Sequence, residues 1–299
     1  MVIVRGAFDE YLAPGARGVF VDEYKELPAE YPGIFNVETS SRAYEDDLVA
    51  TGLGIATSKP EGEEIPMDRP HFRGRVRYIH GGYGLGYEVT REAMEDDLYN
   101  AIVRPSSVNL ARSMREAEEV SAWSIINGAF SSTQAYDGVP LISTAHPGVH
   151  GVTLANRPAV DVDLSYTAIQ GGLERFFNLK TDRGMRISMA PGILLTSVQG
   201  WWLARELLGG EFKPLTDENT INVLRDQGLT PQFSRYLTDP DAWFLIAPKN
   251  MHKLKFYWRR RPTFENGYEG RTGISWFGVT ARWSAGATDW RGIDGSAGA

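Results

Sequence analysis

The residue types of a hydrolytic triad occur together in one short stretch of the chain, as Asp137, Ser143 and His146. In such a triad the histidine takes the serine proton and the carboxylate orients the imidazole, so geometry decides the function and closeness in sequence does not. The G-x-S-x-G turn that exposes a nucleophilic serine is absent. We therefore favour a loop whose polar groups satisfy one another and keep a soluble Ser/His hydrolase as a minor alternative.

A metal site is not expected either. His146 and His150 have the four-residue spacing of zinc ligands on a helix, but Pro147 and Gly148 between them prevent a helix. The chain has no cysteine, which excludes disulfides, thiolate metal sites and cysteine nucleophiles. We predict no catalytic residue, no metal and no cofactor.

A glycine-rich run at residues 81–86, Gly-Gly-Tyr-Gly-Leu-Gly, has some likeness to a phosphate-binding loop. It lacks the Gly-Lys-Ser/Thr ending of a P-loop, so phosphate binding is not predicted. Glycine adopts backbone conformations that other residues avoid. We interpret Gly81, Gly82, Gly84 and Gly86 as a hinge between the segment before them and a helix predicted to begin at Thr90.

Charges are sorted by position in residues 51–88. Residues 58–70 are polar, acidic and rich in proline, and should be exposed. In residues 72–78, arginines at every second position place three guanidinium groups on one face of a strand. We predict a long two-stranded excursion with an acidic tip and a basic stem, which is only marginally stable alone and needs a neighbour. The candidates for charge-assisted contacts with that neighbour are Glu61, Glu63, Glu64, Asp68, Arg69, Arg73, Arg75 and Arg77.

The overall charge argues against a dedicated nucleic-acid binder. The formal net charge is -7, whereas neutralising phosphates requires a surplus of Lys and Arg. Arg259, Arg260 and Arg261 form a local basic run. Two interpretations of this run remain open: a nucleic-acid patch, or partners for carboxylates at a protein interface.

The chain of 299 residues is long enough for two or three modules, and its 42% hydrophobic residues can build a core. Residues 1–50 are rich in turn formers and predict an extended arm without a core of its own. Four-residue apolar spacing predicts a long helix from Thr90 to Gly128 with a break at Arg104-Pro105, carrying Glu119 on its polar face. Alternating aromatic residues near the C-terminus predict strands, before a flexible end.

Neither a secretion signal nor a membrane span is expected. Residues 1–10 have no basic patch followed by an apolar run, and no window approaches 18 consecutive apolar residues. We expect a protein made and kept in aqueous surroundings.

Several segments, in this order, resemble the major capsid proteins of tailed bacteriophages, and together they cover the chain from about Glu88 to the C-terminus. The Leu-Ile-Ser-Thr-Ala-His-Pro loop that ends at Pro147 is the most specific of them. The segments are YEVTREAMEDDLY (87–99), NLARSMR (109–115), INGAF (126–130), DGVPLISTAHP (137–147) with Asn156-Arg157, KTDRGMR (180–186), ILL (193–195) and DWRGIDGS (289–296).

The resemblance implies the α+β Hong-Kong-97-type fold. Residues 1–50 would form the N-arm and residues 51–88 an extended loop that lies over a neighbouring subunit. Residues 89–128 and 251–288 would form the peripheral domain, with the long helix as its spine. Residues 129–250 and 289–299 would form the axial domain.

The resemblance further implies a structural protein that is not an enzyme. It would self-assemble through hexamers and pentamers into the icosahedral head shell around a double-stranded DNA genome. The shell would form in the host bacterial cytoplasm and remain in the virion, without a membrane. Expected partners are a separate scaffolding protein, a portal and decoration proteins, with DNA only close by. Cross-linking through Lys59 is not expected, and an encapsulin-like protein compartment is the alternative.

Overall fold

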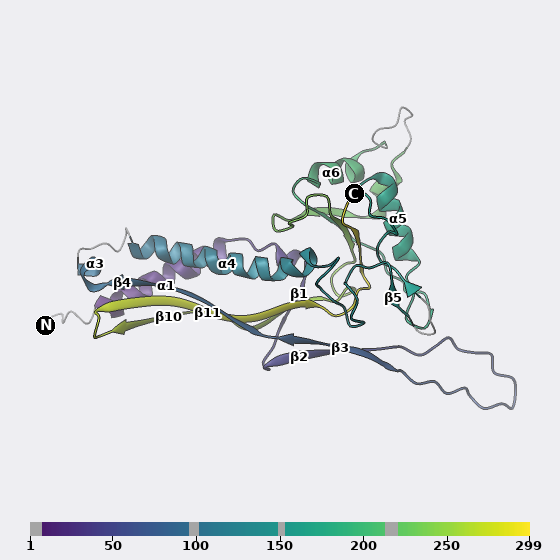
Figure 1. The fold of residues 1–299 in the computed structure, drawn as a ribbon, viewed down its shortest axis with the longest axis horizontal. Coiled ribbons are helices and arrows are strands. Elements are labelled where there is room, and N and C mark those ends of the chain that lie inside the picture. The colour runs from purple at the N-terminus through teal and green to yellow at the C-terminus, as the bar shows by residue number, and fades with distance from the viewer. Residues whose placement is uncertain (1–7, 96–101, 149–152, 213–220) are drawn as a thin grey trace.

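The computed structural model describes residues 8–95, 102–148, 153–212 and 221–299. They form an elongated body of sheet and helix and, at one end of it, a second body that carries the C-terminus (Figure 1). Within these residues, no helix has the length and apolarity that crossing a bilayer requires.

A four-stranded sheet forms the elongated body. Its strand order is β1 (Asn36–Thr39), β10 (Leu254–Glu269), β11 (Ile274–Ala287) and β4 (Gly81–Thr90). β1 joins β10 in parallel, and the other neighbours are antiparallel. On β11 the residues Phe277, Val279, Ala281 and Trp283 are buried at every second position, which confirms the predicted alternation.

One face of this sheet is covered by α4 (Arg104–Asn127), whose position agrees with the predicted spine. Pro105 lies in the first turn of α4, where its missing N–H has no intrahelical partner to lose. The predicted break at Arg104-Pro105 is thus the start of α4. Thr90 Oγ1 accepts a hydrogen bond from the Ala93 N–H at the start of α3 (Arg91–Glu95), as predicted, and residues 96–101 lie outside the described part of the chain.

The prediction of an extended N-terminal arm without a core is wrong for the described residues after 7. Residues Phe8–Glu26 form α1, and Tyr31–Ile34 form the short helix α2. The Phe20 ring lies 5.8 Å from that of Phe264 on β10, and Tyr31, with its ring 4.5 Å from that of Phe256, is 3% exposed. Apolar burial against α4 and β10 therefore gives this segment a fixed place on the chain itself.

The second body is built on another four-stranded sheet, in the order β12 (Ile293–Ser296), β9 (Trp243–Ile246), β7 (Ile193–Thr196) and β8 (Thr230–Phe233). Helices α5 (Tyr166–Phe177) and α6 (Trp201–Gly209) accompany it, with the 3₁₀ turn η4 (Val223–Gln227). Ser165 caps α5 by accepting from the Ala168 N–H. The predicted strands at 193–196 and 243–247 are confirmed, whereas the predicted flexible end is wrong where it includes Gly295 and Ser296.

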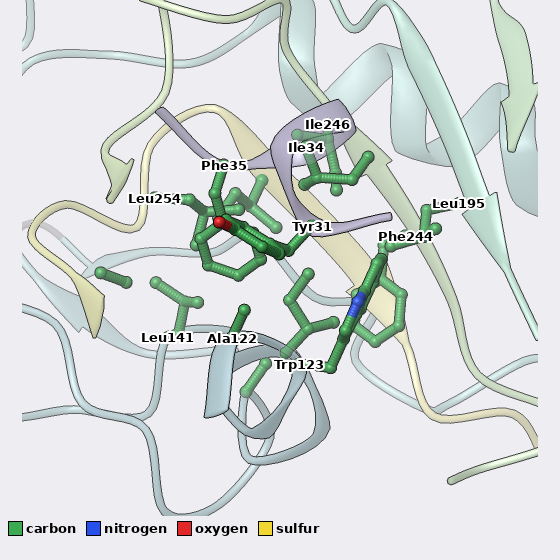
Figure 2. Close-up of a cluster of buried hydrophobic side chains, with 14 of the residues drawn as sticks. Tyr31, Ile34, Phe35, Ala122, Trp123, Leu141, Leu195, Phe244, Ile246 and Leu254 are labelled. Atoms are coloured by element: carbon green, nitrogen blue, oxygen red, sulfur yellow. The ribbon is translucent and has the colours of Figure 1, made fainter. Parts of the chain in front are cut away.

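The two bodies share one apolar core. Figure 2 shows it where Tyr31, Ile34 and Phe35 meet Ala122 and Trp123 of α4 and side chains of the second sheet. The members of the second sheet labelled there are Leu195, Phe244 and Ile246. Because one core connects both bodies, their junction should be stiff.

A two-stranded hairpin leaves the molecule at this junction. Its strands are β2 (Tyr44–Ala50) and β3 (Phe72–Ile79), paired antiparallel, and residues 51–71 extend beyond them (Figure 1). The predicted excursion is therefore present, but it starts at Tyr44 and not at Thr51. Residues 81–90 belong to the main sheet. The remaining pair, β5 (His146–Pro147) with β6 (Thr153–Leu154), is short.

Candidate assembly interface

The arginines of the hairpin stem have acidic partners in their own chain. Arg77 donates to both carboxylate oxygens of Asp46 on β2, at 2.7 and 2.8 Å. Arg75 lies 3.7 Å from the same carboxylate. The hydrogen bonds from Arg77 hold the pKa of Asp46 below its ordinary value. The stem is basic, as predicted, but β2 neutralises part of its charge.

Arg73 connects the stem to the second body. Its Nη2 donates to the Pro147 carbonyl at 2.7 Å, and its Nε lies 3.6 Å from Asp182. Asp182 is 6% exposed. The contact thus joins the loop end of the hairpin stem to the loop at residues 180–186 through a largely buried carboxylate.

Asp68 makes a second contact with the same loop, through Arg183. Its carboxylate accepts from the Gly54 N–H at 2.7 Å, from the Arg69 N–H at 2.8 Å and from the Arg183 guanidinium. These donors, the two backbone N–H groups first, lower the pKa of Asp68 to about 2. Asp68, Arg73, Arg75 and Arg77 were predicted to find their charged partners in a neighbour, and each has one within the chain.

The acidic tip of the hairpin, unlike its stem, has no charged partner among the described residues. Glu61, Glu63 and Glu64 are exposed, and no hydrogen bond or ion pair joins their carboxylates to the described residues. Only the main chain of Arg69 is engaged, with its carbonyl accepting from Arg183. Contacts of Glu61, Glu63, Glu64 and Arg69 with a neighbouring subunit stay a prediction. Their side chains carry charges with which a neighbour could form ion pairs.

Apolar side chains add to the unsatisfied surface of the hairpin. Opposed residues on β2 and β3 share a face, so the pairs Tyr44–Ile79 and Leu48–Arg75 point to the same side. Ile79 is 72% exposed and Leu48 is 68% exposed. In the loop, the exposed large apolar residues are Leu53, Ile55, Ile65 and Met67. A surface of this kind indicates a partner.

His80 is the single residue between β3 of the hairpin and β4 of the main sheet. It is 4% exposed, and its Nδ1 and Nε2 lie 3.0 Å from Ser284 Oγ and Ser40 Oγ. Burial lowers the pKa of His80. Both strands of the hairpin are thus tied to the sheet at one buried imidazole.

Residues 81–86, whose glycines were interpreted as a hinge, are part of β4 and pair with β11 throughout. Gly86 is needed there since a Cβ would lie 2.8 Å from the Phe277 carbonyl oxygen. The same holds more weakly for Gly84, at 3.3 Å from the Val279 carbonyl, whereas Gly82 has open space. A hinge formed by Gly81, Gly82, Gly84 and Gly86 stays a prediction. The pairing of β4 with β11 restricts the movement that such a hinge could allow.

The residues that suggested a triad form a buried structural network. His146 Nδ1 lies 2.7 Å from Asp137 Oδ2, but its Nε2 faces Asn156 Oδ1 at 3.1 Å, and the imidazole is stacked on Trp290 and fully buried. Ser143 Oγ accepts from the Ala145 N–H. The serine and histidine are therefore not arranged for proton transfer.

Asn156 is the centre of this network. Its Oδ1 also accepts from the Ser143 N–H at 2.8 Å, and its Nδ2 donates to the carbonyls of Leu141 and Ile293 at 2.8 and 3.0 Å. It is 2% exposed. One amide thus joins the 137–147 loop to the C-terminal strand, which explains why the motifs that carry the resemblance, though far apart in sequence, share one site.

A second buried group extends the network to the hairpin. Arg291 Nη2 donates to Asp182 at 2.5 Å and to Tyr136 Oη at 3.2 Å, and its Nη1 donates to Asp289 at 3.0 Å. Its carboxylate partners keep the pKa of Arg291 above its ordinary value although burial opposes this. Because Asp182 also faces Arg73, the chain of contacts runs from the C-terminal motif to the loop end of the hairpin stem.

The spine helix carries two buried carboxylates that hold the N-terminal segment. Glu119 accepts from the N–H groups of Glu30 and Tyr31, at 2.7 and 3.0 Å, and from Trp123 Nε1 at 2.9 Å. Burial raises the pKa of Glu119 and of its neighbour Glu118. The prediction that Glu119 lies on a solvated helix face is wrong, because its carboxylate caps the start of α2.

The part of the chain that the structure describes contains no group of three His, Asp or Glu side chains arranged for a metal ion. His150, the second histidine of the zinc-like pair, lies outside the described residues.

A family model described as "Phage capsid protein" matches residues 81–293. No curated protein sequence matches the chain.

Solved structures match over most of the length. The procapsid of bacteriophage JBD30 matches with a TM-score of 0.56 and 14% identity, over 97% of this chain and 75% of that one. The capsid of the native GTA particle gives 0.58 and 10%, over 90% of both chains. The virus-like particle from Pyrococcus furiosus gives 0.54 and 12%, over 95% and 98%. At such low identity these matches show a shared fold, and it is the Hong-Kong-97-type α+β fold expected from the sequence.

Proposed function

Because the chain belongs to the phage capsid protein family, we propose that it is the repeating subunit of an icosahedral head shell that encloses the double-stranded DNA of a tailed phage. Its place is the virion capsid, and its task is structural and not enzymatic. The assembly of one sequence into pentamers and hexamers would make the shell closed and self-limiting.

The observation that carries the proposal is the hairpin that leaves the body of the molecule with partners missing. The charge of its stem is partly neutralised by Asp46 of β2 and Asp182 of the 180–186 loop, while its acidic tip and the apolar side chains Leu48 and Ile79 remain exposed. A neighbouring subunit would supply the missing contacts. The N-terminal segment, once expected to need a neighbour as well, has its apolar partners within the chain.

Shell formation does not need strong individual contacts. A standard interface buries about 800 Å² per partner. Each subunit in a shell has several neighbours, and every contact after the first is effectively intramolecular. Modest pairwise affinity therefore accumulates into a shell that dissociates very slowly.

The division of labour along the chain follows the family. Residues 1–50 would form the N-arm and residues 51–88 the extended loop, except that Tyr44–Ala50 already belong to the hairpin of that loop and residues 81–88 to the main sheet. Residues 89–128 with 251–288 would form the peripheral domain, and residues 129–250 with 289–299 the axial domain around the symmetry axes. A separate scaffolding protein and a portal would assist assembly. The capsid of bacteriophage JBD30 is decorated with minor capsid protein trimers, and decoration proteins are proposed here on that likeness.

The test is electron microscopy and sedimentation of the purified protein. Closed particles of uniform size are expected. The variant Leu48→Ser with Ile79→Ser should give soluble, folded subunits that do not close, and Val160→Ser, at an exposed apolar residue of the second body, is the matched control. A wild-type protein that stays a monomer or dimer at every concentration would refute the proposal.

An encapsulin-like compartment is the second candidate, because a virus-like particle from Pyrococcus furiosus shares the fold. The content of the particles distinguishes the two. Double-stranded DNA in particles from infected cells supports the head shell, whereas a copurifying cargo enzyme supports the compartment.

A further inference from the structure

The hairpin is held by different forces at its root and in its outer half. Near the root, Tyr78 is buried and Val76 packs against the shared core. Further out, residues 52–72 are exposed apart from Gly54. Apolar burial therefore does not set the direction of the outer half, and a two-stranded ribbon is only marginally stable by itself. Figure 1 shows this outer half running beneath the second body.

A tight turn of the second body contacts the outer half of the hairpin. The turn runs from Thr181 to Gly184 and is closed by a hydrogen bond from the Gly184 N–H to the Thr181 carbonyl at 2.9 Å. Gly184 has a φ of 79°, which favours glycine. The buried carboxylate of Asp182 accepts from Arg291. The turn is thus a fixed part of the second body, and it presents Asp182 and Arg183 to the hairpin.

These two side chains bind the hairpin with opposite charges. Asp182 lies 3.6 Å from Arg73 Nε at the loop end of β3. Arg183 donates to the Asp68 carboxylate and, at 2.9 Å, to the Arg69 carbonyl. The Arg183 side chain is only 15% exposed. Two contacts of reversed charge fix position and orientation together, because a shifted or inverted hairpin would bring like charges next to each other.

Asp68 also closes the base of the loop. Its carboxylate accepts from the Gly54 N–H on the outgoing limb at 2.7 Å and from the Arg69 N–H on the returning limb at 2.8 Å. A Cβ on Gly54 would lie 3.3 Å from this carboxylate and 3.5 Å from the Arg183 guanidinium, so the glycine permits the close approach. One carboxylate thus joins both limbs of the hairpin to one arginine of the second body. Residues 55–67, with the acidic tip, extend from this point.

The attachment is polar and not close-packed. A cavity of about 530 Å³ lies between the hairpin and the turn. Its lining residues are Thr51, Gly54, Asp68, His71, Phe72, Arg73 and Arg183. The Asp68 side chain is 44% exposed, and exposed ion pairs add little to the stability of a fold. Removing the contact between Asp68 and Arg183 should therefore change the direction of the loop and leave the stability of the subunit nearly unchanged.

We propose that Asp68, Arg73, Asp182 and Arg183 form a latch that aims the loop of the hairpin before a neighbouring subunit binds it. Asp68 and Arg183 would then be positioning residues for assembly, acting through the direction of residues 55–67. This inference rests on the proposed function. A loop that is already ordered avoids the entropic cost of becoming ordered at an interface. Because each subunit of a shell contributes one such loop, the gain is repeated at every contact.

The opposite role, in which the latch holds the loop back from assembly, has less support. The acidic tip and the apolar side chains Ile65 and Met67 lie beyond the latch. Ile65 is 71% exposed and Met67 is 92% exposed while the latch is closed. A restraining contact would have to cover the surface that it withholds. The closed latch leaves that surface free, so it is consistent with aiming and not with blocking.

Spin labels measure the direction of the loop in the unassembled subunit, since the chain has no cysteine that would compete for the label. Labels at Glu63→Cys on the tip and Thr230→Cys on β8 should give a narrow distribution of distances. Arg183→Gln should broaden this distribution. Arg186→Gln is the matched control, because it removes an exposed arginine of the same loop, and it should change nothing. Distributions equally broad with and without Arg183 would refute the latch.

Light scattering against subunit concentration tests the positioning role. Arg183→Gln should raise the threshold concentration for particle formation about tenfold while the thermal unfolding temperature stays the same. Arg183→Lys keeps the charge and should recover part of the loss, and Arg186→Gln should assemble like the wild type. An unchanged threshold in Arg183→Gln would overturn the inference. A lower threshold would also overturn it, by showing that the latch restrains assembly.

A covalent latch separates aiming from restraint. In the variant Asp68→Cys with Arg183→Cys, a short bismaleimide replaces the length of the arginine side chain and joins the two thiols within one subunit. Joined subunits should assemble at a lower concentration than unjoined ones. If unjoined subunits assemble and joined ones do not, the loop must leave the second body to be bound, and the inference is wrong.

Failure of the proposed function gives a different result. Wild-type subunits that form no particles at any concentration would refute the head shell and, with it, the positioning role. The spin-label distances would still decide whether the latch fixes the loop. Wild-type particles together with an unchanged threshold in Arg183→Gln would refute the positioning role alone.

Discussion

Replacing Asn156 by alanine should destabilise the subunit strongly. The side chain is 2% exposed, and its loss takes a partner from four groups: the half-buried Ser143 N–H and the buried His146 Nε2 and carbonyls of Leu141 and Ile293. An unsatisfied buried polar group costs about 1–3 kcal/mol, and water entering the new cavity recovers part of it. We expect the free energy of unfolding to fall by about 3–5 kcal/mol, a large share of the 5–15 kcal/mol typical of a domain.

The assay is equilibrium unfolding of the unassembled subunit in urea, followed by tryptophan fluorescence. Asn178→Ala is the matched control, because that amide is exposed and makes one hydrogen bond, to the Glu174 carbonyl. It should cost less than about 1 kcal/mol. Asn156→Asp keeps the shape but turns the donor toward two carbonyls into an acceptor, so it should be as harmful as alanine at neutral pH. Equal, small effects of Asn156→Ala and Asn178→Ala would contradict the central role of this amide.

Three further predictions address the other buried polar groups. Glu119→Ala removes the acceptor of the N–H groups at the start of α2, so the free energy of unfolding should fall by about 2–4 kcal/mol, measured by thermal unfolding. Proteolysis of the N-terminal segment should become faster, and an unchanged rate would contradict the capping role. Burial lowers the pKa of His252 to about 4. Between pH 6.5 and 4 the imidazole is therefore protonated in the unfolded chain but not in the folded one. The free energy of unfolding should fall by about 3 kcal/mol as the pH falls through this window. In His252→Asn that loss should disappear from urea unfolding measured across the same range. Arg291→Ala should cost about 3–5 kcal/mol, because it leaves the buried Asp182 with only the Tyr136 hydroxyl and the more distant Arg73 as partners. Adding Asp182→Asn should recover part of this loss in a double-mutant cycle, and additive effects would show that the pair is not coupled.

Strong periodicity made the main helix and the aromatic strands predictable. Apolar residues repeat along α4, and alternation on β11 buries Phe277 and Trp283 as expected. The N-terminal helix was missed because its sequence contains Pro14, Gly15 and Gly18, which local propensity assigns to turns. Its stability comes instead from packing on α4, and local sequence carries no record of a partner more than eighty residues away.

The sequence predicted the charged residues of the candidate site but not the residues that pair with them. Alternating arginines predicted the face of β3, yet the same pattern could not show that Asp46 and Asp182 of the same chain would meet them. Glu119 shows the same difficulty, since a carboxylate on a helix suggests solvent until the backbone N–H groups that it caps are known. The glycine run suggested mobility for a similar reason, although its alternation with Tyr83 and Leu85 was already the signature of a strand.

The length of β10 has a mechanical consequence. Its sixteen residues run from the shared core to the far end of the sheet, which is about 50 Å at ~3.3 Å per residue. A rotation of about one degree at the root therefore displaces the far end by about 1 Å. Small changes in side-chain packing around Leu254 would therefore change the angle between adjacent subunits. The curvature of the shell could then be adjusted without bending β10 itself.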